Sequence, residues 1–214
     1  MKLEDFHDFH MGQTCLIVGL GPNLKLTPPP LFNYPSFGVN TIYKQKEWDW
    51  KPTYYIGVDE RLKLEDGAAV CDLYRDIPKF FPTPDWDDLQ GENIYRFAHR
   101  TGYNFFVGGH SPRHAQALTK EGITYRRIME AVFQIAYHMG FTTMLMIGVQ
   151  HKPNTRNELF WGTDSGEPEK DFAWEEEGYK FFVDTLPVKI LNISMDTYVP
   201  ETILPRDDYR KWMK

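Results

Sequence analysis

The 214-residue sequence predicts a single-domain, Rossmann-like three-layer α/β fold with a mostly parallel sheet. The first observation is an apolar run at residues 15–18 that is bounded by glycines and is too short for a helix, so a buried strand fits it better. The second is the order helix, glycine, strand over residues 122–149, which is typical of a parallel crossover. Because no repeat or linker interrupts residues 1–214, we expect one α/β domain.

Short strands and irregular connections are expected in the first half of the chain. Residues 1–14 form a lead-in, and we expect His7 and His10 at its surface, because no further metal ligand is evident beside them. Prolines at 28–30 exclude a long regular helix, so the connection after the first strand should be short or irregular. Apolar strands follow at 36–43 and 53–59.

The second half carries the strongest helix pattern. Residues 122–139 place apolar side chains at helical spacing, with Thr124 as the expected N-cap and Gly140 just past the helix end. Proline, glycine and polar residues predict loop-rich insertions at 77–101, with a strand near 93–97, and at 150–171. The remaining expected elements are helices at 60–76, 172–185 and 207–212 and strands at 103–107, 142–149 and 188–192.

Composition and charge narrow the function classes. The chain is 42% hydrophobic and 25% charged, which is an ordinary balance for a soluble globular protein. A net charge of −6 argues against a broad nucleic-acid surface. No apolar stretch approaches the roughly 20 residues of a membrane span. Two cysteines do not make a disulfide framework, so we expect a reducing, cytoplasmic location; the oligomeric state stays open.

The turn after the first strand is the first candidate for ligand binding. Gly19 and Gly21 permit close backbone approach, and amides around Gly19–Asn23 could hold a phosphate or a nucleotide sugar. Pro22 has no amide donor, so it would only shape the turn. Asn23 completes the turn as a fourth candidate contact. The alternative is a plain connection between a strand and a loop.

Polar side chains at other element ends extend this candidate site. Asn40 offers a donor and an acceptor for a base or ribose edge. Asp59 could accept from hydroxyl groups, or it could simply cap the following helix. Thr124 at a helix N-terminus would face an anion, and Arg127 could neutralise a diphosphate.

A histidine is the candidate general base. His151 follows a buried strand, where an imidazole with a pKa near neutrality could deprotonate an acceptor hydroxyl. His110 is the alternative base, in a loop that also holds His114. Gln150 and Asp164 are candidate substrate contacts. A loop histidine without a chemical role is the alternative interpretation.

Several motifs together resemble one known family. The opening Gly19–Leu24 is similar to the G-x-G-P-S-L motif of MptE-like 6-hydroxymethylpterin diphosphokinases and of family-42 bacterial sialyltransferases. Further similar segments are Gly38-Val39-Asn40, Tyr55–Asp59, Gly122-Ile123-Thr124, Ala136–Phe141, Met146–Val149 and Asn192-Ile193-Ser194 with Thr197. The chain departs from the pattern at Leu20, where the family often has asparagine, and at Gln150, where it has aspartate.

The resemblance implies a nucleotide-dependent transferase with no permanently bound cofactor. The leading expectation is a glycosyltransferase that uses a CMP- or UDP-sugar donor and an unknown hydroxyl acceptor. One alternative is an ATP-dependent pterin diphosphokinase, which would need Mg²⁺. Gln150 argues against that alternative, because Mg²⁺ prefers carboxylate oxygens and position 150 carries an amide. The other alternative is a nucleotide-binding module without catalysis.

Overall fold

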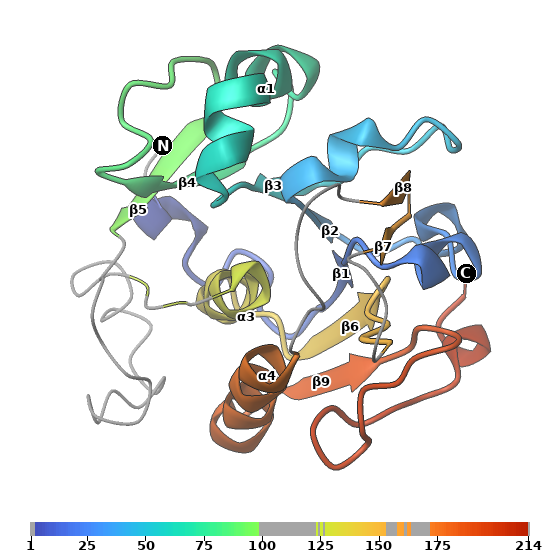
Figure 1. The fold of residues 1–214 in the computed structure, drawn as a ribbon. Helices are drawn as coiled ribbons and strands as arrows, with labels where there is room; N and C mark the ends of the chain where they lie inside the picture. The colour runs from blue at the N-terminus through green and yellow to red at the C-terminus, as the bar shows by residue number, and fades with distance from the viewer. Residues whose placement is uncertain are drawn as a thin grey trace.

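The computed structural model describes residues 3–98, 123, 125, 127–152, 158–160, 162–163 and 172–213. Its main feature is a seven-stranded sheet in which every strand pair is parallel, in the order β5-β4-β3-β2-β1-β6-β9. This confirms the predicted Rossmann-like α/β fold (Figure 1). The strands are β1 (Thr14–Val18), β2 (Ser36–Val39), β3 (Tyr54–Ile56), β4 (Lys79–Thr83), β5 (Ile94–Ala98), β6 (Thr143–Ile147) and β9 (Lys189–Asn192).

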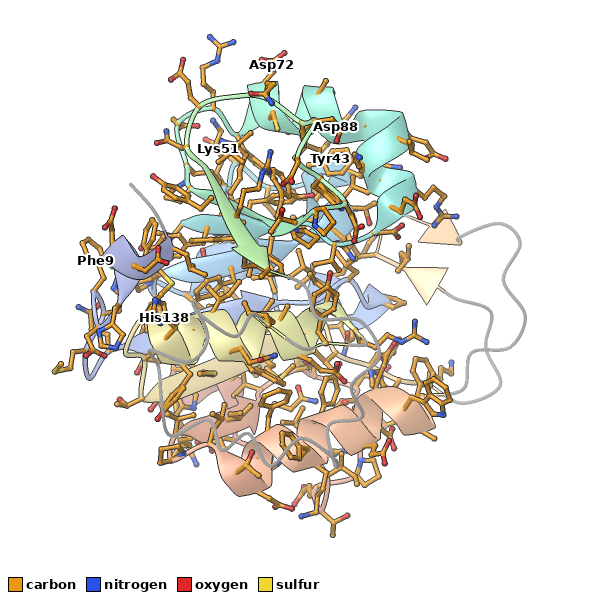
Figure 2. The ribbon with its side chains drawn as sticks, turned by 90° about the vertical axis from the view of Figure 1, so that its left-hand side faces the viewer. Phe9, Tyr43, Lys51, Asp72, Asp88 and His138 are labelled. Atoms are coloured by element: carbon orange, nitrogen blue, oxygen red, sulfur yellow. The ribbon has the colours of Figure 1, made fainter. Side chains whose placement is uncertain are left out.

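Helices cover both faces of the sheet. In Figure 2, α1 lies above the strands and α4 below them. The helices are α1 (Glu60–Leu73), α3 (Ile128–His138) and α4 (Ala173–Thr185). Short 3-10 helices are η1 (Leu3–Phe6), η2 (Pro22–Lys25), η3 (Pro29–Leu31), η4 (Asn40–Lys44) and η5 (Tyr209–Lys211), and β7 (Glu158–Leu159) pairs with β8 (Gly162–Thr163) as a small antiparallel ribbon.

Alternation along the strands builds two cores. Cys15 and Ile17 of β1 pack with α3, α4 and η1, whereas Leu16 and Val18 pack with α1 and the loops on the opposite face. Both sets are fully buried, as expected for a central parallel strand. Cys15 is a small core residue, and both cysteines of the chain are free thiols.

The N-terminal segment is tied to the end of α3. The amides of Asp8, His10 and Gly12 donate to the carbonyl oxygens of His138, Met139 and Gly140, at 3.0, 2.7 and 3.0 Å. Figure 2 accordingly shows Phe9 and His138 at the same end of the molecule. Gly140 has φ +87° and follows the helix as predicted.

The expectation that His10 lies at the surface is wrong. The His10 side chain is buried, its Nε2 lies 2.6 Å from the Tyr54 hydroxyl, and its ring stacks on Phe141. The ring acts as a core side chain that carries its own hydrogen-bond partners. His7, three residues earlier, is exposed as expected.

Three element boundaries differ from the sequence prediction. The segment 77–101 contains two strands rather than one, because β4 forms around the buried pair Phe80 and Phe81 despite Pro82. Residues 40–44 form η4 instead of continuing β2. The strong helix begins at Ile128, with Arg127 as its N-cap, instead of near Thr124.

Local hydrogen bonds explain the late start of α3. The Glu130 carboxylate accepts the Arg127 amide at 3.1 Å and so caps the first turn. Ile123 is held instead by the end of β5, because its amide donates to the Ala98 carbonyl at 2.7 Å. Thr124 itself, His110, His114, Asp164 and the expected strand at 103–107 lie outside the described residues. No helix among the described residues is long and apolar enough to cross a membrane.

Candidate functional site

The topology defines where a ligand of this fold would bind. From β1 the chain proceeds through β2, β3 and β4 to the edge strand β5, and it then returns to β6 on the other side of β1. In open parallel sheets, ligands bind outside the carboxyl ends of the strands at such a reversal. The reversal lies between the parallel strands β1 and β6, and the β6 arrow points to the right in Figure 1, toward the β7–β8 ribbon.

The predicted glycine turn lies at this reversal, and its glycines have a structural explanation. The Gly19 amide donates to the Ile147 carbonyl and the Gly21 amide to the Gly148 carbonyl, both at 2.8 Å. A Cβ atom on Gly19 would lie 2.6 Å from the Gly148 oxygen. The glycines therefore let two strand ends come together. Since both amides are already bonded, any phosphate contact needs another donor.

Asn23 holds the loop after β9 against this turn. Its side chain is 2% exposed, and its Nδ2 donates to the Met195 carbonyl at 2.8 Å and reaches the carbonyls of Val149 and Asp196 at 3.4 Å. Pro22, directly before it, begins η2 as its fixed φ favours. The predicted residue is thus at the carboxyl edge, where it binds the protein itself.

The loop after β9 adds residues that were not among the predicted site residues. Asn192 is buried, its Oδ1 accepts the Ser194 amide at 3.0 Å, and its Nδ2 donates to Thr197 Oγ1 at 3.1 Å. Ser194 Oγ accepts the Val149 amide at 3.2 Å. The N-x-S segment with Thr197 is the sequence signal that points to this network. It fixes the loop beside the end of β6.

Gln150 and Asp196 form the outer part of the same edge. Gln150 Nε2 donates to Asp196 Oδ2 at 2.9 Å, and the Tyr198 amide donates to the Gln150 carbonyl at 2.8 Å. Asp196 has φ +49°, a left-handed conformation that Asp tolerates better than most residues. The side chain of Gln150 thus lies beside a carboxylate, that of Asp196.

Asn40 and Asp59 follow β2 and β3 at the same edge. Asn40 has φ +40°, its Oδ1 accepts the Val58 amide at 3.1 Å, and its carbonyl accepts the Tyr55 hydroxyl at 2.6 Å. Its side chain is partly exposed. Asp59 is the N-cap of α1, and its Oδ1 accepts the Arg61 amide at 2.9 Å. Its contacts are thus those of a residue that caps the following helix.

His151 lies in a dense polar cluster. Its Nε2 is 3.1 Å from Glu175 Oε2, and its Nδ1 is 3.4 Å from Glu176 Oε1. Burial of the imidazole lowers its pKa, but the hydrogen bonds and negative charges of the two glutamates raise it more, so the pKa of His151 lies above its usual value. A proton acceptor at this position must first lose the proton that the carboxylates stabilise.

Arg127 joins this cluster from the start of α3. Its Nε lies 3.4 Å from Glu175 Oε1, so it contacts a carboxylate of the protein. Glu175 and Glu176 were not predicted as functional residues. Their signal in the sequence is the acidic run at residues 175–177, which falls in the first half of α4, where helices favour negative charge. Glu175 links His151 to Arg127.

The fold and this edge together define the class: a Rossmann-like α/β protein with polar groups gathered where strand order reverses. No family model matches the chain, and neither does any curated protein. Among solved structures, the chain is similar to the structure of MAf glycosyltransferase from Magnetospirillum magneticum AMB-1, with a TM-score of 0.58 and 11% identity. The match covers 95% of this chain and 35% of the other, so the chain spans about a third of that protein's length.

Proposed function

We propose that this chain is a nucleotide-dependent transferase, and most specifically a glycosyltransferase that takes a CMP- or UDP-sugar. The observation that carries the proposal is the meeting of polar residues from the ends of β1, β6 and β9 at the point where strand order reverses. The glycosyltransferase named above shares this fold over nearly the whole chain, and this likeness supports the same class of activity.

Asn40 is the residue that we assign to the donor nucleotide. Its Oδ1 is occupied by the Val58 amide, so the Nδ2 group is the part that can donate to a base or ribose oxygen. Gln150 and Asp196 lie at the reversal itself, where a donor sugar or acceptor hydroxyl would be placed. Asn23 and the two glycines hold this edge in shape.

His151 remains our candidate for the group that accepts a proton from the acceptor. Its surroundings set a condition on this role, because the imidazole is 7% exposed and contacts two carboxylates. It can act as a base only at a pH where its proton has been lost. His110, the second candidate, lies outside the described residues.

Binding measurements on variants of the edge test the proposal. We expect CMP or UDP, with or without the sugar, to raise the Tm of the protein, because a ligand that binds only the folded state stabilises it. Asn40→Asp should lower nucleotide affinity at least about tenfold, since it keeps the acceptor for the Val58 amide but replaces the free donor by a negative oxygen.

A matched control separates binding from folding. Asn93 also has a left-handed backbone, with φ +53°, but it lies before β5 at the opposite edge, so Asn93→Asp should leave nucleotide affinity unchanged. A rise in Tm with ATP and Mg²⁺, and with no other nucleotide, would favour the diphosphokinase. Binding without turnover would favour a non-catalytic module, and no shift with any nucleotide would refute the proposal.

A further inference from the structure

The cluster around His151 connects three separate segments of the chain. His151 follows β6, Glu175 and Glu176 lie in the first turn of α4, and Arg127 precedes α3. The His151 Nε2–Glu175 Oε2 distance is 3.1 Å, the His151 Nδ1–Glu176 Oε1 distance is 3.4 Å, and the Arg127 Nε–Glu175 Oε1 distance is 3.4 Å. One imidazole thus contacts two consecutive carboxylates of a helix.

The imidazole is enclosed between aromatic rings. Phe172 stacks on it, with ring centroids 4.3 Å apart and planes at 12°. The Tyr179 ring also stacks on the imidazole, with ring centroids 5.4 Å apart and planes at 26°. His151 and Glu175 side chains are 7% and 10% exposed, so water screens their interaction poorly. Charge–charge interactions inside the cluster are therefore stronger than those of surface pairs.

The protonated imidazole offsets negative charge in the cluster. The groups that contact His151 are the carboxylates of Glu175 and Glu176 and, 3.5 Å from Nε2, the Tyr179 hydroxyl. Arg127 contacts Glu175, the buried Glu130 of α3 acts on Tyr179 through its charge, and the exposed Lys152 follows His151. With the proton present, both ring nitrogens of His151 donate to the glutamates, and the cationic ring offsets part of their negative charge.

Loss of the proton reverses one contact. A neutral imidazole keeps a single N–H, so its other nitrogen presents a lone pair to a carboxylate oxygen. The two glutamates then lose their attraction to the imidazolium charge, while Arg127 still contacts Glu175. His151 also has φ +51°, a backbone conformation that costs free energy and persists only when surrounding contacts hold it.

We propose that His151 is a pH-sensitive latch that, while protonated, fastens the first turn of α4 to the segment after β6. Raising the pH removes the proton and weakens the latch. Gln150 precedes His151 and holds Asp196, so the latch sets the position of the carboxyl edge of the sheet. The effect on nucleotide binding rests on the proposed function, whereas the effect on stability does not.

The direction of the pH dependence follows from linkage. The pKa of His151 is raised in the folded protein above the usual value of 6.5, so its stabilising contribution is complete below that value. The contribution is lost as the pH rises through the folded-state pKa. The protein should therefore resist urea better at pH 6 than at pH 9, and the same change should weaken nucleotide binding.

The first test compares the urea midpoint of the parent and of His151→Gln from pH 6 to pH 9. His151→Gln retains a hydrogen-bonding side chain but not the titrating charge, so we expect its midpoint to depend less on pH. His7→Gln is the matched control, because His7 lies 3.3 Å from Asp8 but is 40% exposed. It replaces an exposed imidazole that lies outside the cluster in the same way. Equal pH dependence in parent and His151→Gln would overturn the proposal.

A second test does not depend on a variant that folds. The ring protons of His151 in the parent, followed by NMR against pH, should titrate above 6.5. Glu176→Gln removes one of the two charges and should lower the His151 pKa. Titration of His151 at or below the usual value would overturn the latch. If no nucleotide binds, the proposed function fails while these stability and titration results still decide the latch.

Discussion

Gly19 and Gly148 lie face to face, and neither position has room for a side chain. A Cβ atom on Gly148 would be 2.6 Å from the Gly19 oxygen, just as one on Gly19 would be 2.6 Å from the Gly148 oxygen. Gly148 also has φ +69°, where an L-residue is strained. The two glycines therefore allow the carboxyl ends of β1 and β6 to approach each other closely.

Gly148→Ala should destabilise the protein strongly. We expect a loss of about 3 kcal/mol or more, the sum of left-handed strain and of overpacking against backbone. Gly12→Ala is the control, because Gly12 has φ +77° but nothing within 4 Å of its Cβ position, so only the strain of about 1–2 kcal/mol should remain. Urea unfolding measures both. Equal losses would show that the contact with Gly19 costs nothing.

Gly21→Val should reduce stability as well as ligand binding. Its Cβ would lie 2.8 Å from the Gly148 oxygen and 2.9 Å from Asn23 Oδ1, so the turn must shift by an amount that costs roughly 1–3 kcal/mol. The variant should therefore lose stability even before any ligand is added. A lowered Tm without ligand is the result to look for, and an unchanged Tm would contradict the tight packing of this turn.

Asn23→Asp should lower the free energy of unfolding more than Asn23→Ala does. Alanine removes the Nδ2 donor and leaves the Met195 carbonyl without that partner, for a loss of roughly 1–3 kcal/mol. Aspartate adds a buried negative oxygen close to carbonyl oxygens, for roughly 2–4 kcal/mol. Gln150→Ala, which removes one partly exposed hydrogen bond, should stay within about 0.5 kcal/mol. The reverse order of the two Asn23 variants would refute this account.

His151→Ala should lower turnover by roughly 10²–10⁴-fold if the imidazole is the general base. The rate of the parent should then rise with pH through the raised pKa of His151, because the base works only without its proton. Steady-state rates with saturating donor, measured from pH 6 to pH 9, check this. A full-rate His151→Ala enzyme would exclude the role and direct attention to His110.

Local patterns predicted most of the fold. Short apolar runs identified β1, β2, β3, β6 and β9, and the helical stripe identified α3. The strand β4 was missed because Pro82 and the acidic residues that follow it are not typical of a strand. Phe80 and Phe81, which are consecutive and therefore point to opposite faces of the sheet, are nevertheless both buried. The start of α3 was misplaced because Glu130, rather than Thr124, determines the cap.

The candidate site was predictable only in part. Strand-end positions identified the glycine turn, Asn40 and His151, because parallel strands end at one edge. The partners of His151 could not be predicted in this way. Glu175 and Glu176 are more than twenty residues further along the chain, and their contact depends on how α4 docks. Asn23 stays a predicted nucleotide contact, and the bond from its side chain to the loop after β9 could not be predicted from the strand-end pattern.

The pairing of Thr14 with Thr143 has a consequence for folding during synthesis. On the ribosome, β1 emerges early, but its partner on one side is synthesised only after more than a hundred further residues. The chain from β1 to β5 can assemble first, and until β6 arrives one side of β1 presents unpaired amides and carbonyls. Such an edge invites pairing with other chains. We therefore expect the growing chain to be more prone to aggregation until residue 147 has left the exit tunnel, whereas in the folded protein β6 covers this edge.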